Sequence, residues 1–182
     1  MRKQMVRAAI AVISVTLLLV LVALLTMHTD AVEMECEIVY PSESDAEVIA
    51  QILYYECRYL SELEQSAVVW VILNRVDSPL SYFPDTVYEV CTQRMGGTYM
   101  FAYRADAPVQ EDLYILAMDV LQRWCDEKNG HGNVGRTLPP EYVYFWGNGK
   151  RNFFRIEYQG NEYWDWSLPD PYAEIENNSG GY

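Results

Sequence analysis

Residues 42–76, SESDAEVIAQILYYECRYLSELEQSAVVWVILNRV, decide the fold because two helical patterns meet there at a polar corner. The first pattern starts at Ser44, since a serine followed three residues later by a glutamate, here Glu47, is typical of a helix N-terminus. Apolar residues then recur at the three- and four-residue steps of an amphipathic helix: Ala46, Ile49, Ala50, Leu53 and Cys57.

Glu56 lies beside this apolar stripe, at the end of the first helical pattern. Burial among apolar side chains raises the pKa of a carboxyl group, and a general acid needs a raised pKa. The pattern therefore makes Glu56 a candidate catalytic acid. The alternative is that Glu56 pairs with Arg58 or lies on a solvated edge of the helix.

The second helical pattern begins at Ser61, which is again followed by a glutamate three residues later, Glu64. Residues 67–73 are apolar on every side, which predicts the central buried helix of the domain. This helix is expected to end at Asn74-Arg75-Val76, before the break at Ser78-Pro79.

Residues 47–165 contain four features in order, each occurring once: Glu56-Cys57-Arg58, the single residue Gln65, Leu73-Asn74-Arg75-Val76 and Phe83-Pro84-Asp85-Thr86-Val87-Tyr88. In this order they resemble the SleB/CwlJ-type cell-wall hydrolase family. In that family the first glutamate of a Glu-Ala-Arg-Gly-Glu motif is taken to be catalytic, so the resemblance implies this role for Glu56. The chain departs from the motif after Arg58, where Tyr59-Leu60 replaces Gly-Glu, and Asn161-Glu162 stands where the family has an Asn-His pair.

The expected fold class is α+β. The resemblance implies a mainly helical, lysozyme-like domain, and the residues add a short helix from Asp85 or Thr86 through Cys91 and a long helix over residues 110–128. Three β-prone segments then predict a small antiparallel sheet: residues 141–146, 154–158 and 162–166.

Further site residues are expected around Glu56. Arg58 and Gln65 lie at the corner between the two helices and are predicted to shape the site or hold the substrate. Residues 92–108 form a glycine-hinged aromatic loop, whose amide and ring side chains suit a sugar-binding cleft, unless the rings only pin the loop. The resemblance places a glutamine and a phenylalanine in this region, here Gln93 and Phe101. The other predicted substrate-binding residues in the loop and the sheet are Tyr99, Tyr144 and Asn148.

The resemblance implies cleavage of the peptidoglycan glycan strand between N-acetylmuramic acid and N-acetylglucosamine by a lytic transglycosylase that uses Glu56 alone. A two-carboxylate mechanism needs a second acid, and Glu62 and Glu64 are explained by capping and by the helix dipole. No metal or cofactor is expected. Two alternatives stay open, an amidase that cuts the peptide from the glycan, and a glycan-binding or scaffold protein that has lost turnover. Any protein partner in the cell envelope stays unspecified.

Composition excludes some functions. The formal charge is −13, and after the three basic residues at the N-terminus the chain carries ten basic and 26 acidic side chains, which argues against nucleic acid as a partner. The two histidines, His28 and His131, cannot build a paired-histidine zinc site. Cys36, Cys57, Cys91 and Cys125 allow disulfides, but their pairing is open.

The N-terminal part predicts delivery of the domain across a membrane. A basic tip, residues 1–7, precedes an uncharged apolar run, residues 8–27, that has the length of a membrane-spanning helix, so the N-terminus is expected to be cytoplasmic and the domain extracellular. The alternative interpretation is a signal peptide that is cleaved near Thr29-Asp30-Ala31, which would give a secreted protein. The segments that follow are predicted to be an acidic stalk over 28–41, the hydrolase domain over 42–171 and a disordered tail over 172–182.

Overall fold

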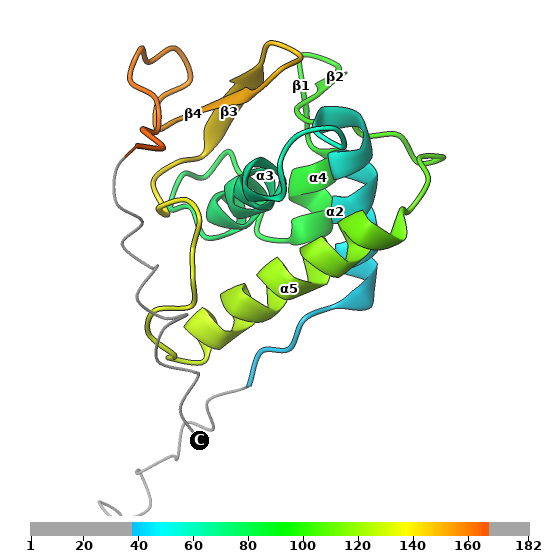
Figure 1. The fold of residues 1–182 in the computed structure, drawn as a ribbon, viewed down its shortest axis with the longest axis vertical. Helices are drawn as coiled ribbons and strands as arrows, with labels where there is room; N and C mark the ends of the chain where they lie inside the picture. The colour runs from blue at the N-terminus through cyan, green and yellow to red at the C-terminus, as the bar shows by residue number, and fades with distance from the viewer. Residues whose placement is uncertain (1–37, 168–182) are drawn as a thin grey trace, which may run out of the picture. The chain divides into compact units, whose positions relative to one another are not determined.

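The computed structural model describes residues 38–167, which form helices and two small antiparallel sheets (Figure 1). The helices are α2 (Glu43–Glu56), α3 (Glu62–Val76), α4 (Val87–Thr92) and α5 (Glu111–Lys128). The strands are β1 (Arg94–Met95), β2 (Thr98–Tyr99), β3 (Tyr144–Gly147) and β4 (Asn152–Arg155), paired β1 with β2 and β3 with β4. The predicted α+β class is therefore confirmed for this part of the chain.

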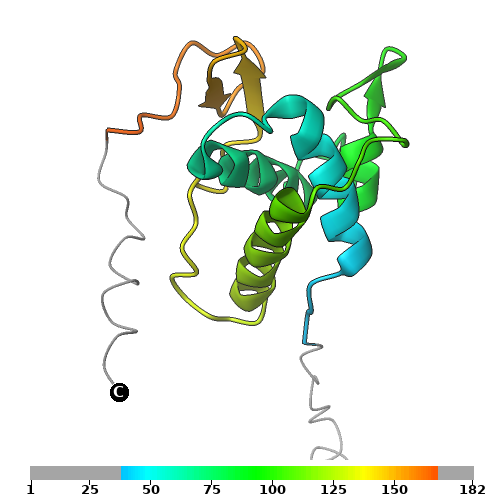
Figure 2. The ribbon, with the colours of Figure 1, turned by 45° about the vertical axis from the view of Figure 1, so that its right-hand side comes forward.

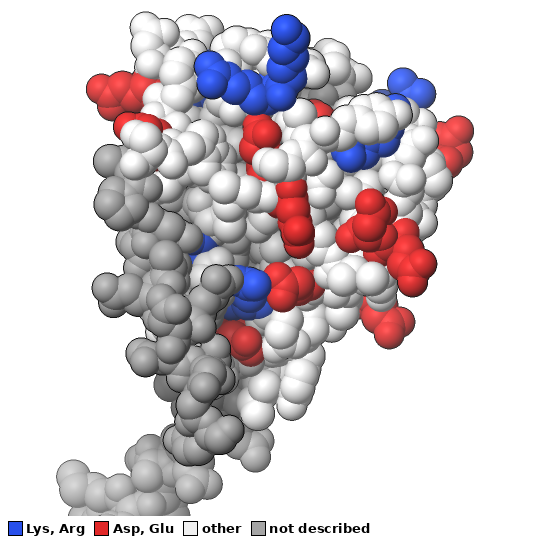
Figure 3. All heavy atoms as spheres, in the orientation of Figure 1, with Lys and Arg blue, Asp and Glu red and all other residues white. Residues whose placement is uncertain are grey.

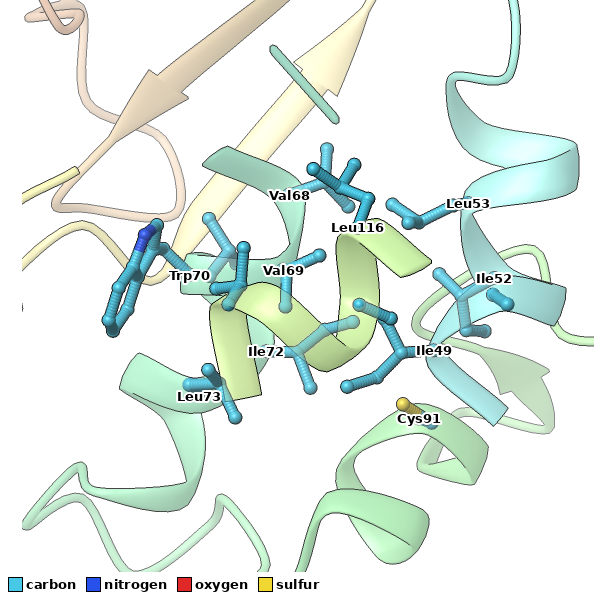
Figure 4. Close-up of a cluster of buried hydrophobic side chains, with 14 of the residues drawn as sticks. Ile49, Ile52, Leu53, Val68, Val69, Trp70, Ile72, Leu73, Cys91 and Leu116 are labelled. Carbon is cyan, nitrogen blue, oxygen red and sulfur yellow. The ribbon is translucent and has the colours of Figure 1, made fainter. Parts of the chain in front are cut away.

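Helix α3 forms the centre of the domain, as its sequence predicts. Every residue from 67 to 73 is fully buried, and α2, α4, α5 and β3 all contact this helix. Figures 1 and 2 show α3 with α5 below it, α2 and α4 to its right and the β3–β4 hairpin above it. In Figure 4, apolar side chains of α2, α3 and α5 converge on one another, and Cys91 of α4 closes one edge of the cluster.

The helix starts follow the serine and threonine signals, with one shift. Ser61 and Thr86 cap α3 and α4 by accepting the N–H of Glu64 and Glu89, each at 3.3 Å. The first helix begins at Ser42 and not at Ser44: the Ser42 Oγ accepts the Asp45 N–H at 3.4 Å. Ser42 has the extended backbone that an N-cap needs, which places Ser44 inside the first turn.

The end of α3 holds the chain that leads into β3. The Asn74 amide nitrogen donates to the carbonyls of Pro139 at 2.8 Å and Tyr142 at 2.9 Å, and the Arg75 Nε donates to the Val143 carbonyl at 2.8 Å. Buried backbone carbonyls need such partners. Asn74-Arg75 therefore fixes the β3–β4 hairpin against the helical core.

Two features of the strands differ from the prediction. The loop after α4 contains the β1–β2 hairpin, whose turn residues Gly96 and Gly97 have φ values of 58° and 86°, as a tight two-residue turn requires. After β4, the chain turns at Glu157, whose carbonyl accepts the Gly160 N–H at 3.2 Å. The predicted third strand over 162–166 is absent, and one backbone bond, from Trp164 N–H to the Phe154 carbonyl at 2.8 Å, joins that segment to β4.

Most predictions for the ends of the chain fall outside residues 38–167, namely the anchor over 8–27, the tip over 1–7, the tail over 172–182 and most of the stalk. Within the described range, no helix is both long and apolar enough to span a membrane. The last stalk residues pack on the domain, because the backbone N–H and carbonyl of Val39 bond reciprocally to the Asn129 amide, both at 2.9 Å. Cys57, Cys91 and Cys125 are buried and unpaired with one another.

Candidate active site

Glu56 is the last residue of α2, and its carboxylate is half-buried. The Ala102 N–H donates to Oε1 at 2.6 Å, which leaves Oε2 without a protein partner among the described residues. Burial raises the pKa of Glu56, while the Ala102 hydrogen bond and the positive charge of Arg75 oppose this rise. The structure therefore agrees with the setting that the apolar stripe predicts, and one carboxylate oxygen is free to carry and transfer a proton.

A pocket of about 390 Å³ opens at Glu56. One wall is the α2–α3 corner, residues 55–60, and the other comes from the β3–β4 hairpin with Gly147, Gly149, Arg151 and Asn152. Of these lining residues in the described part of the chain, Glu56 is the one carboxylate, and Arg58 and Arg151 are the two cations. The pocket thus combines a single acid with donors on both sides.

The β3–β4 wall is tied to the helical corner through Glu64. The Glu64 Oε1 accepts the backbone N–H of Asn152 at 2.8 Å, while Oε2 accepts the hydroxyl of Ser61 at 3.3 Å. On the hairpin, Gly147 lets the Asn152 side chain come close, since a Cβ at Gly147 would lie 2.7 Å from the Asn152 Oδ1. Glu64 therefore joins the two walls of the pocket, in addition to capping α3.

Arg75 lies behind the pocket and acts on Glu56 through its charge, although the motif that contains it assigned it no role at the site. It is 3 % exposed, and its guanidinium lies over the rings of Phe101 at 4.5 Å, Phe83 at 5.2 Å and Tyr144 at 5.8 Å. Its Nη1 has no hydrogen-bond partner in the described structure. Desolvation lowers the pKa of Arg75 to about 10, so the side chain stays charged at neutral pH and acts on the nearby Glu56 carboxylate.

Arg58 lies at the mouth of the pocket. Its Nη1 donates to the Tyr54 carbonyl at 2.6 Å in the last turn of α2, and its guanidinium packs over the rings of Tyr54 and Tyr59 at 4.5 and 4.3 Å. This position places a positive charge at the helix C-terminus, where it is favourable. It does not form an ion pair with Glu56, so the alternative pairing proposed for Glu56 is absent from the described residues.

Gln65 holds the corner together and does not line the pocket. Its Nε2 lies within hydrogen-bond distance of three backbone carbonyls, those of Cys57 at 3.2 Å and of Arg58 and Leu60 at 3.3 Å. These carbonyls follow the end of α2. The Cys57 carbonyl also accepts the Leu60 N–H at 2.9 Å, whereas those of Arg58 and Leu60 have no backbone partner among the described residues. Gln65 thus fixes the turn that presents Glu56.

Replacing Gln65 by alanine is therefore expected to loosen the corner. The loss of a partner for half-buried carbonyls should cost about 1–2 kcal/mol of unfolding free energy and lower turnover several-fold. Thermal or denaturant unfolding measures the loss of stability, and the initial rate of the catalysed reaction measures the loss of turnover. Unchanged stability and unchanged turnover together would show that Gln65 does not shape the site.

The loop after α4 reaches Glu56 through its backbone. Phe101 is 2 % exposed, so it lies in the core and not on the pocket surface. It directly precedes Ala102, whose N–H binds Glu56, and its burial therefore helps to hold that N–H in place. Gln93 donates to the Tyr82 carbonyl at 2.5 Å, and Tyr99 lies under the Arg94 guanidinium at 4.0 Å. None of these three lines the pocket, and their roles in binding stay predictions.

Tyr144 and Asn148 have structural partners. The Tyr144 hydroxyl bonds to the Tyr82 hydroxyl, and burial together with this bond raises the pKa of Tyr144 to about 12. Asn148 accepts the backbone N–H groups of Lys150 and Arg151 at 3.0 Å and so shapes the β3–β4 turn. The flanking residues Gly147 and Gly149 reach the pocket, whereas Tyr144 and Asn148 do not.

The charge around the site contrasts with the acidic chain. Figure 3 shows a group of basic side chains at the top of the view, where the β3–β4 turn lies, and separate groups of acidic and a few further basic side chains on the rest of the visible face. Lys150 and Arg151 lie in this turn. Among residues 38–167, no group of three or more His, Cys, Asp and Glu side chains is placed to hold a metal ion.

Comparison with known protein families gives one match. The model of the family described as Cell Wall Hydrolase matches residues 61–178, which include Gln65, Gln93 and the β3–β4 hairpin. The match begins after Glu56 and Arg58, so it does not assign those two residues. Comparison with curated proteins and with solved structures gives no match, and the lysozyme likeness stays a prediction. The family match covers more than half of the chain, and it confirms the resemblance carried by the sequence motifs: the chain belongs to the SleB-type Cell Wall Hydrolase family.

Proposed function

We propose that this cell wall hydrolase cleaves the glycan strand of peptidoglycan between N-acetylmuramic acid and N-acetylglucosamine, as a lytic transglycosylase with Glu56 as its catalytic acid and base. The observation that carries the proposal is the geometry of Glu56: a half-buried carboxylate with a raised pKa, one oxygen fixed by the Ala102 N–H, at the edge of an open pocket. General acid catalysis requires this combination of access and raised pKa.

In this reaction Glu56 acts first as an acid, in its protonated form, and then as a base, in its deprotonated form. The protonated Oε2 of Glu56 gives its proton to the glycosidic oxygen as the bond from that oxygen to the muramic C1 breaks. The resulting carboxylate then accepts the proton of the muramic C6 hydroxyl while O6 bonds to C1 and closes an anhydro ring. Water is not consumed, and Glu56 ends protonated again.

The lining of the pocket supports a single-acid mechanism over a two-carboxylate one. Glycosidases that use two carboxylates hold them about 5–10 Å apart on either side of the bond that breaks. No second carboxylate lines the pocket among the described residues, and Glu64 uses both of its oxygens in bonds to Asn152 and Ser61. Arg58 and Arg151 fit the carboxylates of the peptide attached to muramic acid.

A digest of purified peptidoglycan, analysed by mass spectrometry, tests the proposal. Anhydro-muropeptides are the expected products. Muropeptides with a reducing end would show hydrolysis in place of transglycosylation, and free peptides would show an amidase. Intact peptidoglycan that nevertheless retains the protein would show a glycan-binding or scaffold role.

The proposal extends to location. An apolar run over residues 8–27 behind a basic tip would tether the domain to the outer face of the cell membrane. Because Val39 is bonded to Asn129, the extended chain over residues 28–38 would reach at most about 35 Å, at about 3.3 Å per residue. Cleavage would then be confined to glycan near the membrane.

Cell fractionation with external protease checks the tether. A full-length, membrane-bound protein that the protease digests from outside is the expected result. A soluble product that begins near Val32 would establish a cleaved signal peptide and a secreted enzyme.

A further inference from the structure

A second pocket, also of about 390 Å³, lies next to the Glu56 pocket. One wall is formed by Arg151, Asn152 and Phe153 of the β3–β4 hairpin. The other is formed by residues 163–167, which follow the turn after β4. Arg151 and Asn152 line both pockets, so the two adjoin at the β3–β4 hairpin. Neither the sequence motifs nor the predicted sugar-binding residues pointed to this segment.

The second pocket has the composition of a carbohydrate site. Tyr163 and Trp166, both 39 % exposed, line this pocket with their aromatic rings. The ring of Phe153 is stacked by Trp146, with ring centres 4.5 Å apart and planes 13° apart, and the Arg151 guanidinium also lies over it at 4.6 Å. Aromatic rings pack against the apolar faces of sugar rings, as they do against other flat apolar groups. A cluster of exposed aromatic side chains is typical of a binding site.

Polar groups on the same walls complement a neutral sugar. Asn152 is 4 % exposed, and its Nδ2 has no hydrogen-bond acceptor among the described residues; the Trp164 Nε1 is also buried without one. Unpaired buried donors are costly, and a hydroxyl or N-acetyl oxygen would satisfy them. Asp165 accepts from the N–H and hydroxyl of Ser167 through Oδ1, at 2.9 and 2.7 Å, which leaves Oδ2 for a ligand hydroxyl.

We propose that this second pocket is a distal subsite for a neutral N-acetylhexosamine of the same glycan strand whose cleavage is proposed at Glu56. The inference rests on that proposed function, because the shared wall of Arg151 and Asn152 places both pockets on one path. Arg151 and Asp165 give this pocket one charge of each sign, and its other lining residues are neutral, so a neutral sugar without an attached peptide fits best. The enzyme then acts on strands long enough to fill both pockets.

Binding of N-acetylglucosamine oligomers tests the subsite without turnover. Trp164 and Trp166 line the pocket, so tryptophan fluorescence reports its occupation, and Glu56→Gln serves as the parent protein. Affinity is expected to rise from the dimer to the hexamer. Tyr163→Ala should lower the hexamer affinity about two- to tenfold, as expected for one lost aromatic contact, and leave dimer affinity unchanged. Tyr163→Phe keeps the ring and should restore most of the hexamer affinity.

Tyr40→Ala is the matched control, because Tyr40 is 73 % exposed and lines neither pocket. The inference is overturned if Tyr163→Ala binds hexamer as the parent does, or if it loses dimer and hexamer affinity equally. Length-dependent binding that needs Tyr163, together with peptidoglycan left uncut by the wild-type enzyme, would support the subsite while contradicting the proposed cleavage.

Discussion

Replacing Glu56 by glutamine should lower the rate of peptidoglycan cleavage by about 10² to 10⁴, the range that general acid catalysis supplies. Glutamine keeps the size of the side chain and an oxygen that can accept the Ala102 N–H, but it cannot give a proton to the glycosidic oxygen. The release of soluble muropeptides measures the rate. A variant that keeps more than about a tenth of the wild-type rate would remove Glu56 from the catalytic role.

Glu62→Gln is the matched control for this substitution. Glu62 is exposed in the first turn of α3 and lines neither pocket, so its variant makes the same chemical change outside the site. We expect it to keep wild-type activity. A loss equal to that of Glu56→Gln would point to a general effect of charge on substrate binding.

The same substitution should also change stability in a pH-dependent direction. Folding raises the pKa of Glu56, so its carboxyl group contributes most favourably below the ordinary pKa of about 4.3, and this contribution is lost as pH rises through the folded-state value. Glutamine does not titrate. Glu56→Gln should therefore gain stability relative to the wild type as pH is raised from about 4 to about 8, as melting temperatures would show. A gain toward acid pH instead would contradict a raised pKa.

The helical half of this fold follows from local patterns. The all-apolar run over residues 67–73 predicts a central helix because a helix that is apolar all round must be buried, and α3 is fully buried there. Glu56 was predicted from its place beside the α2 stripe, and the structure buries it as expected. Both predictions depend on neighbours within a few turns of one helix.

The other wall of the site depends on contacts between distant residues. Arg75 meets Val143 and Phe101, which are far from it in the sequence, so no periodic pattern marks it as part of the site. The alternation near residues 154–158 suggested a strand, but β4 ends at Arg155 because a turn follows. The β1–β2 hairpin was not predicted, although two consecutive glycines, Gly96 and Gly97, favour the positive φ values of a tight hairpin turn.

Arg75 poses a physical question, because it is a buried charge with an unpartnered Nη1 and a pKa lowered to about 10. Burying a charge in this way costs stability, and an apolar side chain of similar volume is often tolerated as well or better. A residue kept at such a cost is a candidate for function. Its charge opposes the rise in the Glu56 pKa, so it stabilises the carboxylate that forms when Glu56 gives up its proton.

Arg75→Met should therefore affect turnover more than stability. Methionine fills the space between the aromatic rings but leaves the Val143 carbonyl unpaired, a cost of about 1–3 kcal/mol that the removal of the buried charge offsets in part. Loss of about 1.4 kcal/mol of charge stabilisation in the transition state would lower kcat about tenfold. Unfolding experiments and initial rates on the same samples separate the two effects.

The pH profile distinguishes an electrostatic role for Arg75 from a purely structural one. Glu56 must be protonated to act, so activity falls as pH rises through its pKa. Without the Arg75 charge that pKa rises further, and the alkaline limb of the profile should move to higher pH. Arg75→Lys keeps the charge and should return the limb toward its wild-type position, even if the altered hydrogen bonds lower the rate. A lower rate with an unmoved alkaline limb in Arg75→Met would mean that Arg75 serves the site only by holding β3 in place.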